Sequence, residues 1–445
     1  MVVSDYMQSI PYEDNTSIVW HSVFGRPMLI SNNLLNHLES KRRRQQDPEI
    51  TKRFDKNALR ILMESHLVVI SKSQEESDIY DLFAIHNNKD HNKVKYLSLI
   101  MSEECPFRCT YCIHFANSKH YYNPEKMMTL DIAKPSIDQY FKLVEANGLD
   151  SAYVNFGGGE PLLNFNTIKQ LLPYINDYRK QLSIPVRIGI NTNLSLLTEE
   201  IARELIKYDV EIATSLDGTK EANDKVRLTK TLTGTYDQII RGITLLDHLG
   251  RPLDGVAITV TEDNFHDIDT TIVNWAVAHH MTEIRIDIDV VGTVNIPVAK
   301  ITSKLRAIRA YAKTKGISVI GFWSRPAENL GLIPEQEDIG FCGGERGNSI
   351  CVAPSGQVFP CGYSNNQIAT YKNILTIEHS PAYQKLLDKR DLTKLKDCKN
   401  CPILGFCRGG CLITNEANDT PDKKSAMCKL YIEMTKSILK ESVEM

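Results

Sequence analysis

Cysteine is the residue type whose number and spacing point most directly to chemistry in this chain. The 445 residues include eleven cysteines, three of them in segment 105–112 and eight in segment 342–428. The number is odd, and Met1–Asp14 is polar and acidic where a secretion signal would be basic and then apolar. We therefore expect a cytoplasmic protein with reduced thiols, in which clustered cysteines bind metal or iron–sulfur clusters.

The first group is Cys105-Pro-Phe-Arg-Cys109-Thr-Tyr-Cys112. Three thiolates on one short loop can hold three irons of a cubane cluster and leave the fourth iron without a protein ligand. Such an iron could bind a substrate, as catalytic metal sites with an open position do. A zinc site with His114 or His120 as fourth ligand is the alternative, and the spacing alone leaves both open.

The second group is denser and contains eight cysteines. Eight thiolates suffice for two closed four-cysteine clusters, which offer no substrate position and so suit electron transfer or a structural role. Two structural zinc ions are the alternative. The group consists of Cys342, Cys351, Cys361, Cys398, Cys401, Cys407, Cys411 and Cys428.

The composition is that of a soluble globular protein, with 42% hydrophobic and 24% charged residues. Lys and Arg number 52 against 55 Asp and Glu, a net charge of −3, so we expect no nucleic-acid partner. The basic block Lys41–Arg44 is interpreted as a solvated surface. No stretch approaches the roughly 18–20 apolar residues of a membrane span, so we expect no membrane partner.

The middle of the chain, free of cysteine, alternates apolar strand patterns with helical patterns such as Asp138–Asn147 and Thr235–Leu249, each followed by Gly. This alternation predicts an α/β fold with a parallel sheet and ligand residues at the carboxyl ends of its strands. Periodicity leaves open whether the sheet is open or a partial barrel. The predicted strands are Tyr96–Met101, Ala152–Phe156, Val186–Ile190, Val210–Ser215, Gly255–Val260 and Glu283–Ile288.

The first 95 residues show a different pattern. A short strand at Met28–Ile30, helices at Asn33–Glu39 and Lys56–Ser65, and an extended segment at His66–Ile70 predict a small winged-helix-like unit or a plain α+β cap. Near the other end, Pro326–Gly340 is rich in Pro, Gly and acidic residues and is interpreted as the connection into the cysteine-rich region.

Polar motifs follow three of the predicted strands: Phe156-Gly-Gly-Gly-Glu-Pro161, Asn191-Thr-Asn193, and Thr214-Ser-Leu-Asp-Gly218 with Arg227 beyond it. Glycines allow the backbone to approach a ligand closely. Arginine suits a carboxylate through its two-armed guanidinium group. These motifs predict a cofactor pocket at the carboxyl edge of the sheet.

The CxxxCxxC spacing with an aromatic residue before the last cysteine, together with these ordered motifs, resembles the radical S-adenosylmethionine (SAM) superfamily. The resemblance implies a partial (β/α)6 TIM-type barrel in which SAM chelates the open iron of a [4Fe–4S] cluster. Cleavage of SAM there yields a 5′-deoxyadenosyl radical that abstracts a substrate hydrogen.

The resemblance also assigns the SAM contacts. Tyr111 would pack near the adenine, Ser215 would meet the ribose, and Arg227 would pair with the methionyl carboxylate. The backbone and acid of the GGEP motif would receive the methionyl amine. The implied contacts are Tyr111, Gly158, Gly159, Glu160, Asn191, Ser215 and Arg227, with Thr259 and Asn264 as further pocket residues.

The second cysteine group resembles the SPASM extension of radical enzymes that modify peptides and proteins, including a Gly356 five residues before Cys361. The resemblance implies two auxiliary [4Fe–4S] clusters and hence three in all. It predicts three domains: a winged-helix-like peptide-recognition domain (1–95), a radical SAM partial barrel (96–325) and a SPASM domain (326–445). The implied ligand sets are Cys342, Cys351, Cys361 and Cys411, called here the first auxiliary set, and Cys398, Cys401, Cys407 and Cys428, the second auxiliary set.

One departure bears on the reaction. Sulfatase maturases carry an acidic residue directly after the cysteine that matches Cys361, whereas this chain has Gly362. We therefore favour radical modification of a ribosomally made precursor peptide, whose leader the N-terminal region would capture by strand addition. A protein side chain or a small molecule is the alternative substrate, and a non-catalytic iron–sulfur protein the alternative class. A flavodoxin or ferredoxin would supply electrons. The sequence assigns no catalytic base.

Overall fold

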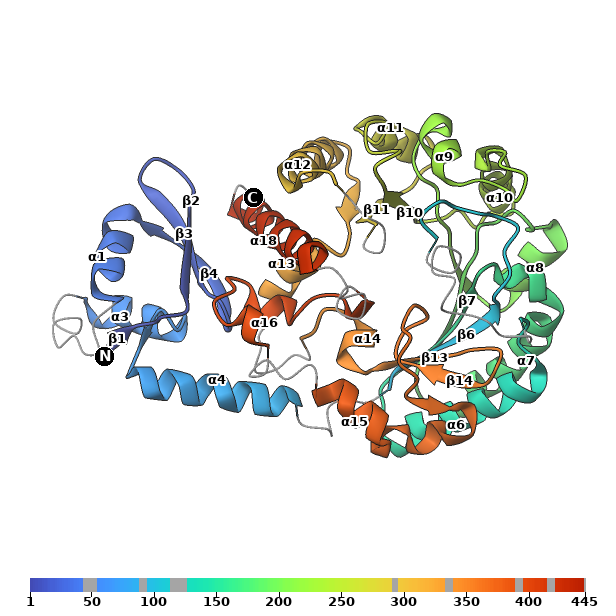
Figure 1. Cartoon of the computed structure of the whole chain (residues 1–445), viewed down its shortest axis with the longest axis horizontal. Coiled ribbons are helices and arrows are strands. Elements are labelled where there is room, and N and C mark those ends of the chain that lie inside the picture. Colours follow the sequence, from blue (N-terminus) through green and yellow to red (C-terminus); the bar gives the residue numbers. More distant parts are fainter. Residues whose placement is uncertain are drawn as a thin grey trace.

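The computed structural model describes residues 1–42, 54–87, 94–112, 126–289, 295–332, 339–388, 395–413 and 421–443. Figure 1 shows an N-terminal unit, a curved barrel with helices on its outer side, and a C-terminal region between them. His114 and His120, named above as alternative zinc ligands, lie outside the described residues. No described helix is both long enough and apolar enough to cross a membrane.

The expected parallel α/β architecture is confirmed for the middle of the chain. Four strands pair in parallel in the order β6-β7-β8-β9, and β10-β11-β12 continue the wall as a second parallel sheet. A parallel bridge between Ser215 and Ala257 joins the two sheets. The strands are β6 (Tyr96–Ser102), β7 (Ala152–Gly158), β8 (Val186–Asn191), β9 (Val210–Ala213), β10 (Gly255–Val260), β11 (Glu283–Ile288) and β12 (Ser318–Ile320).

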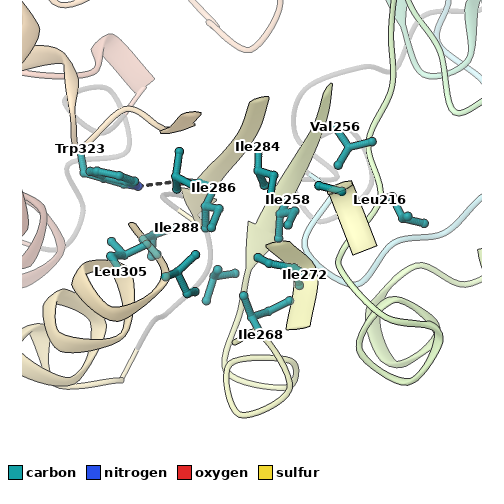
Figure 2. Packing of buried hydrophobic residues seen from close by; sticks show 14 of the residues in the cluster. Leu216, Val256, Ile258, Ile268, Ile272, Ile284, Ile286, Ile288, Leu305 and Trp323 are labelled. Atoms are coloured by element: carbon teal, nitrogen blue, oxygen red, sulfur yellow. Dashed lines mark hydrogen bonds between the residues drawn. The ribbon is translucent and has the colours of Figure 1, made fainter. Parts of the chain in front are cut away.

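Helices between these strands cover the outside of the sheet (Figure 1). Figure 2 shows how isoleucine and valine side chains of β10 and β11 pack against helical residues such as Leu305, and how the Trp323 indole donates to the Ile286 carbonyl at 2.6 Å. The helices are α6 (Leu130–Ala146), η2 (Pro161–Asn164), α7 (Phe165–Gln181), α8 (Glu199–Lys207), α9 (Lys220–Val226), α10 (Tyr236–His248), α11 (Thr271–Ala278) and α12 (Val298–Thr314).

Two predicted boundaries in this region are wrong. The helix expected over Asp138–Asn147 begins at Leu130 and continues through Pro135, which lacks the N–H that would bond to the Asp131 carbonyl. The strand expected to reach Ser215 ends at Ala213. Beyond that point the backbone bridges to Ala257 instead of continuing the ladder with β8.

The C-terminal region is built into the barrel wall. Strand β13 pairs in parallel with β6 and antiparallel with β14, so residues 349–359 extend the same sheet that begins at Tyr96. The elements are α13 (Arg325–Leu330), α14 (Gly343–Arg346), β13 (Ser349–Val352), β14 (Gln357–Phe359), β15 (Ala369–Thr370), η3 (Tyr371–His379), α15 (Pro381–Asp388), η4 (Lys396–Cys398), α16 (Leu404–Cys407) and α18 (Pro421–Val443). Helix α13 occupies part of the segment interpreted above as a connection.

The N-terminal region contains an antiparallel sheet in the order β2-β3-β4, of which the sequence patterns predicted only the Met28–Ile30 portion. The predicted helices are present, but the winged-helix-like arrangement stays a prediction. The elements are β1 (Val2–Val3), β2 (Met7–Pro11), β3 (Thr16–His21), β4 (Gly25–Ser31), α1 (Asn32–Arg42), α3 (Lys56–Glu64), β5 (Val68–Val69) and α4 (Lys72–Asn87).

This N-terminal sheet packs directly on the loop that carries the second auxiliary set. The Trp20 indole donates to the Pro402 carbonyl at 2.8 Å, and the Gly405 amide donates to Ser22 at 3.0 Å. A methyl group added at Gly405 would lie 2.2 Å from the Val23 carbonyl oxygen. Only a glycine at this position lets the two regions come so close.

Candidate active site

The loop 105–112 follows β6 and is held from one side by the end of β7. The Gly159 and Glu160 amides donate to the carbonyls of Ser102 and Glu104 at 2.7 and 2.9 Å. Gly158 has a φ of +117°, and a methyl group there would lie 2.3 Å from the Ser102 carbonyl oxygen. At Gly159 it would lie 2.5 Å from that of Glu104. The glycines thus permit the loop to sit on the strand end, as the motif predicted.

The other side of the loop is held by the chain after α9. The Arg108 amide donates to Leu228 at 2.6 Å and the Thr110 amide to Val226 at 2.9 Å. These bonds place the three cysteines beside Arg227. The loop conformation is therefore fixed by two motifs that lie far from it in sequence.

Burial raises the pKa of Cys105 to about 12 and that of Cys109 to about 11. The Cys105 sulfur accepts from the Phe107 amide and from the Asn193 side chain, both at 3.4 Å. A thiol with such a pKa holds its proton until a metal displaces it. N–H groups that point at the sulfur atom stabilise the negative charge of a thiolate ligand.

Glu160 lies fully buried at the end of β7. Its carboxylate accepts from the Leu162 amide at 3.0 Å, the Thr192 hydroxyl at 2.7 Å and the Asn193 amide at 2.8 Å. Burial raises the pKa of Glu160 to about 7, although these three bonds oppose the shift. A cation beside Glu160 would stabilise its ionised form, which is consistent with the expected role as acceptor for an amine.

Arg227 and Asp217 form a buried two-armed ion pair. The Arg227 Nε and Nη2 atoms lie 2.8 and 3.2 Å from the Asp217 oxygens. Asp217 also accepts from the Tyr111 hydroxyl at 2.6 Å and the Thr259 amide at 2.7 Å. Burial would lower the pKa of Arg227, but Asp217 outweighs it and the pKa is raised. The sequence missed Asp217, and two nitrogens of Arg227 are already committed to it.

The remaining predicted contacts lie at neighbouring strand ends. Ser215 is at the bridge between the two sheets, and Asn264 donates to the Thr259 carbonyl at 2.9 Å. Asn191 is exposed at the end of β8. Its neighbour Asn193, not Asn191, is the residue that the structure brings to Cys105, which the polar motif alone could not distinguish.

The first auxiliary set is brought together by burial in one region. Cys351 lies in β13 with its side chain toward Ser98 of β6, and Cys361 follows β14. Burial raises the pKa of Cys361, and the nearby thiols of Cys342, Cys351 and Cys411 raise it further. Cys342, Cys351 and Cys411 therefore lie within electrostatic reach of Cys361, and the ligand set that the resemblance implies stays a prediction.

The second auxiliary set is separate from the first. Burial raises the pKa of Cys407 well above its usual value, and Cys401, Cys428 and Cys398 raise it further. Burial likewise raises the pKa of Cys401 to about 11, with contributions from Cys398 and Cys428. Among the described residues, no three His, Cys, Asp or Glu side chains converge closely enough to hold one metal ion.

Residues 99–272 match the family model of the Radical SAM superfamily. The chain is 23% identical over 474 residues to the Radical SAM cyclopropyl synthase TigE of Paramaledivibacter caminithermalis, an alignment that covers 100% of this chain and 98% of that protein. It is 29% identical over 160 residues to the cysteine-type anaerobic sulfatase-maturating enzyme of Clostridium novyi, covering 35% of this chain and 41% of that enzyme.

Residues 99–272 are thus a radical SAM domain, and the chain is an enzyme. Its fold is also that of native anSMEcpe with bound AdoMet and Cp18Cys peptide, with a TM-score of 0.64 and 17% identity over 78% of this chain and 98% of that one. A radical SAM domain implies one [4Fe–4S] cluster and SAM. The donor set fits: the loop carries three thiols, of which Cys105 is buried and accepts from two N–H groups, and it lies beside a buried acid and an arginine.

One residue that the sequence missed is Tyr363. It lies two positions after Cys361, and half of its side chain (50%) is exposed. Burial of the other half raises the pKa of Tyr363 to about 12, and the thiols of Cys361 and Cys112 raise it further. Thiols of both the first auxiliary set and the loop 105–112 therefore act on this phenol.

Proposed function

We propose that this radical SAM enzyme removes a hydrogen atom from an unactivated carbon of a ribosomally made precursor peptide and installs a crosslink or ring. When bound, SAM and the cluster of the loop 105–112 would supply the radical that takes the hydrogen atom, through reductive cleavage of SAM. An auxiliary cluster would accept the electron that bond formation releases. The substrate thus loses two hydrogen atoms, one to 5′-deoxyadenosine and one as a proton and an electron. An external low-potential reductant such as a flavodoxin or ferredoxin provides the electron for cleavage.

The observation that carries this proposal is the place of Tyr363. The thiols of Cys112 and Cys361 both raise the pKa of Tyr363, which supports a substrate space that borders both the loop 105–112 and the first auxiliary set. A substrate in that space would be close to an electron acceptor, which a bond-forming oxidation needs. The residues proposed to hold SAM are Tyr111, Gly158, Gly159, Glu160, Ser215 and Arg227, with Asn193 added and Asn191 retained at the strand end.

Three clusters are proposed, one on the loop 105–112 and one on each auxiliary set. The thiol chemistry fits, because all eleven cysteines fall into a group of three and two groups of four. The buried hydroxyl of Tyr431, which has no hydrogen-bond partner among the described residues, lies beside both auxiliary sets. The three-domain division, with boundaries at 95 and 325, is part of the same proposal.

A peptide substrate is supported by two comparisons. The similarity to a radical SAM cyclopropyl synthase runs through the whole chain, including the N-terminal region. The similar fold of anSMEcpe has been solved with a peptide bound. We infer that the leader of the precursor adds as a strand to the N-terminal sheet.

The N-terminal sheet has two edges to which such a strand could add. Strands β2 and β4 are the edges of the sheet, and β4 packs beside α13. At the two ends of the β2–β3 pair, the Tyr12 amide donates to the Thr16 carbonyl and the Ser22 amide to the Tyr6 carbonyl. The backbone N–H and C=O groups of even-numbered residues in β2 therefore point toward β3. The Ser9 amide therefore points outward, and we assign leader capture to this edge.

Mass spectrometry of a candidate precursor co-expressed with the enzyme tests the function. The expected product has lost two hydrogen atoms, and deuterium at the modified carbon appears in 5′-deoxyadenosine. Ser9→Pro should abolish leader binding without breaking the β2–β3 ladder, whereas the control Ser9→Ala should bind normally. Full peptide turnover by the Ser9→Pro enzyme would contradict leader capture at this edge. SAM cleavage without any peptide product would contradict the substrate class.

A second candidate is modification of a protein side chain, favoured by the similarity to a sulfatase-maturating enzyme. Gly362 stands against it, because that position carries the acid in sulfatase maturases. Incubation with a cysteine-containing sulfatase peptide decides between the two. Conversion of that peptide in place of the precursor would establish this second function.

A further inference from the structure

Tyr431 lies where residues next to both auxiliary sets meet. It is on α18, three residues after Cys428 and thus on the same helix face. Its ring packs on Phe341, the neighbour of Cys342, with centroids 5.2 Å apart. A methyl group added at Gly410, which precedes Cys411, would lie 3.4 Å from the ring.

The hydroxyl of Tyr431 has no hydrogen-bond partner among the residues that the structure describes. The residue is 3% exposed, so solvent does not supply one. A tyrosine phenol is protonated at neutral pH, so this hydroxyl is a buried hydrogen-bond donor that lacks an acceptor among the described residues.

Asp287 is a charged group near this hydroxyl. Its oxygens already accept from the Arg285 Nε at 2.6 Å and from the Phe322 amide at 2.7 Å. Cysteine sulfur is an acceptor that the residues around the ring can offer, because the ring lies against Gly410, which precedes Cys411.

We propose that the Tyr431 hydroxyl donates a hydrogen bond to a sulfur atom of the cluster bound by the first auxiliary set and thereby sets that cluster's reduction potential. This inference rests on the proposed function, because it requires that cluster. A hydrogen bond to sulfur stabilises the more negative, reduced state and so raises the potential. Tyr431 is accordingly a positioning and tuning residue, not a catalytic one.

The test is a redox titration of the reconstituted full-length enzyme, followed by electron paramagnetic resonance, for the wild type and Tyr431→Phe. Loss of the bond should make reduction of the first auxiliary cluster about fivefold less favourable, which is a fall of about 40 mV for a one-electron couple. The potential of the second auxiliary cluster should be unchanged. Tyr383→Phe is the matched control, because Tyr383 is equally buried but its hydroxyl donates to Gly347 at 2.7 Å.

The outcomes separate this inference from the proposed function. About 12 irons per chain with a lowered first auxiliary potential in Tyr431→Phe supports it. The same iron content with unchanged potentials, or with a shift confined to the second auxiliary cluster, overturns it while leaving the three-cluster proposal intact. About four irons per wild-type chain contradicts the three clusters themselves and so overturns both.

Discussion

Arg227 offers the sharpest test of the SAM site, because it is both a predicted ligand contact and one half of a buried ion pair. Its partner Asp217 is fully buried and accepts from three groups in all. Removing the guanidinium by Arg227→Ala would leave that carboxylate unpaired, which costs about 3–5 kcal/mol of folding free energy. Weak SAM binding by this variant would therefore have two explanations.

Arg227→Lys separates them. Lysine keeps a positive charge beside Asp217 but has no planar fork, so it cannot hold Asp217 and the methionyl carboxylate together. A charge-assisted hydrogen bond is worth about 1.5–3 kcal/mol, so we expect SAM to bind about tenfold to hundredfold more weakly. The free energy of unfolding should fall by clearly less in Arg227→Lys than in Arg227→Ala.

The assay is isothermal titration of SAM into anaerobically reconstituted enzyme, with iron content and thermal unfolding measured on the same samples. Arg251→Lys is the control, since Arg251 pairs with Asp209 at 2.7 Å on the surface and should change neither quantity. Wild-type affinity in Arg227→Lys, together with reduced stability, would refute the assignment. Arg227 would then serve only to neutralise Asp217.

Three further predictions concern the cysteine loop, Glu160, and the contact between Gly405 and the N-terminal region. Replacing all three cysteines of the loop 105–112 by Ala should remove about a third of the iron and all 5′-deoxyadenosine formation; residual SAM cleavage would refute the site. Because the pKa of Glu160 is raised from 4.5 to about 7, its contribution to stability is present at low pH and is lost as pH rises from about 4.5 through about 7. SAM affinity should rise over the upper part of that range, as the carboxylate ionises, and a flat profile would contradict the amine contact. Gly405→Ala should lower the melting temperature and make the second auxiliary set lose iron, because the new methyl group meets the Val23 carbonyl oxygen, while Gly331→Ala, where the nearest atom is 3.5 Å away, should do neither.

Local sequence determined the strands and the motifs that follow them. The runs at Gly255–Val260 and Glu283–Ile288 are strands with the predicted bounds, because in each a buried β-branched residue alternates with a half-buried one, the period of a strand. The GGEP glycines were predictable for a similar reason, since close backbone approach needs residues without a side chain. The boundaries of helices and strands were not predictable where tertiary contacts set them. Strand β3 was not predicted, and its Trp20 packs on the distant loop at Pro402, a contact that the linear pattern does not show.

The candidate site likewise has features that the sequence predicted and features that only the tertiary structure determined. Residue types and spacing determined which eleven thiols are available, because ligation chemistry depends on cysteine itself. Only the tertiary structure brought Asn193 to the Cys105 sulfur and paired Arg227 with Asp217. It alone brought Cys411 into electrostatic reach of Cys361 and left the Tyr431 hydroxyl buried with no partner among the described residues. Those facts depend on which distant segments come into contact, and a linear pattern of residues carries no distance between segments that meet only after folding.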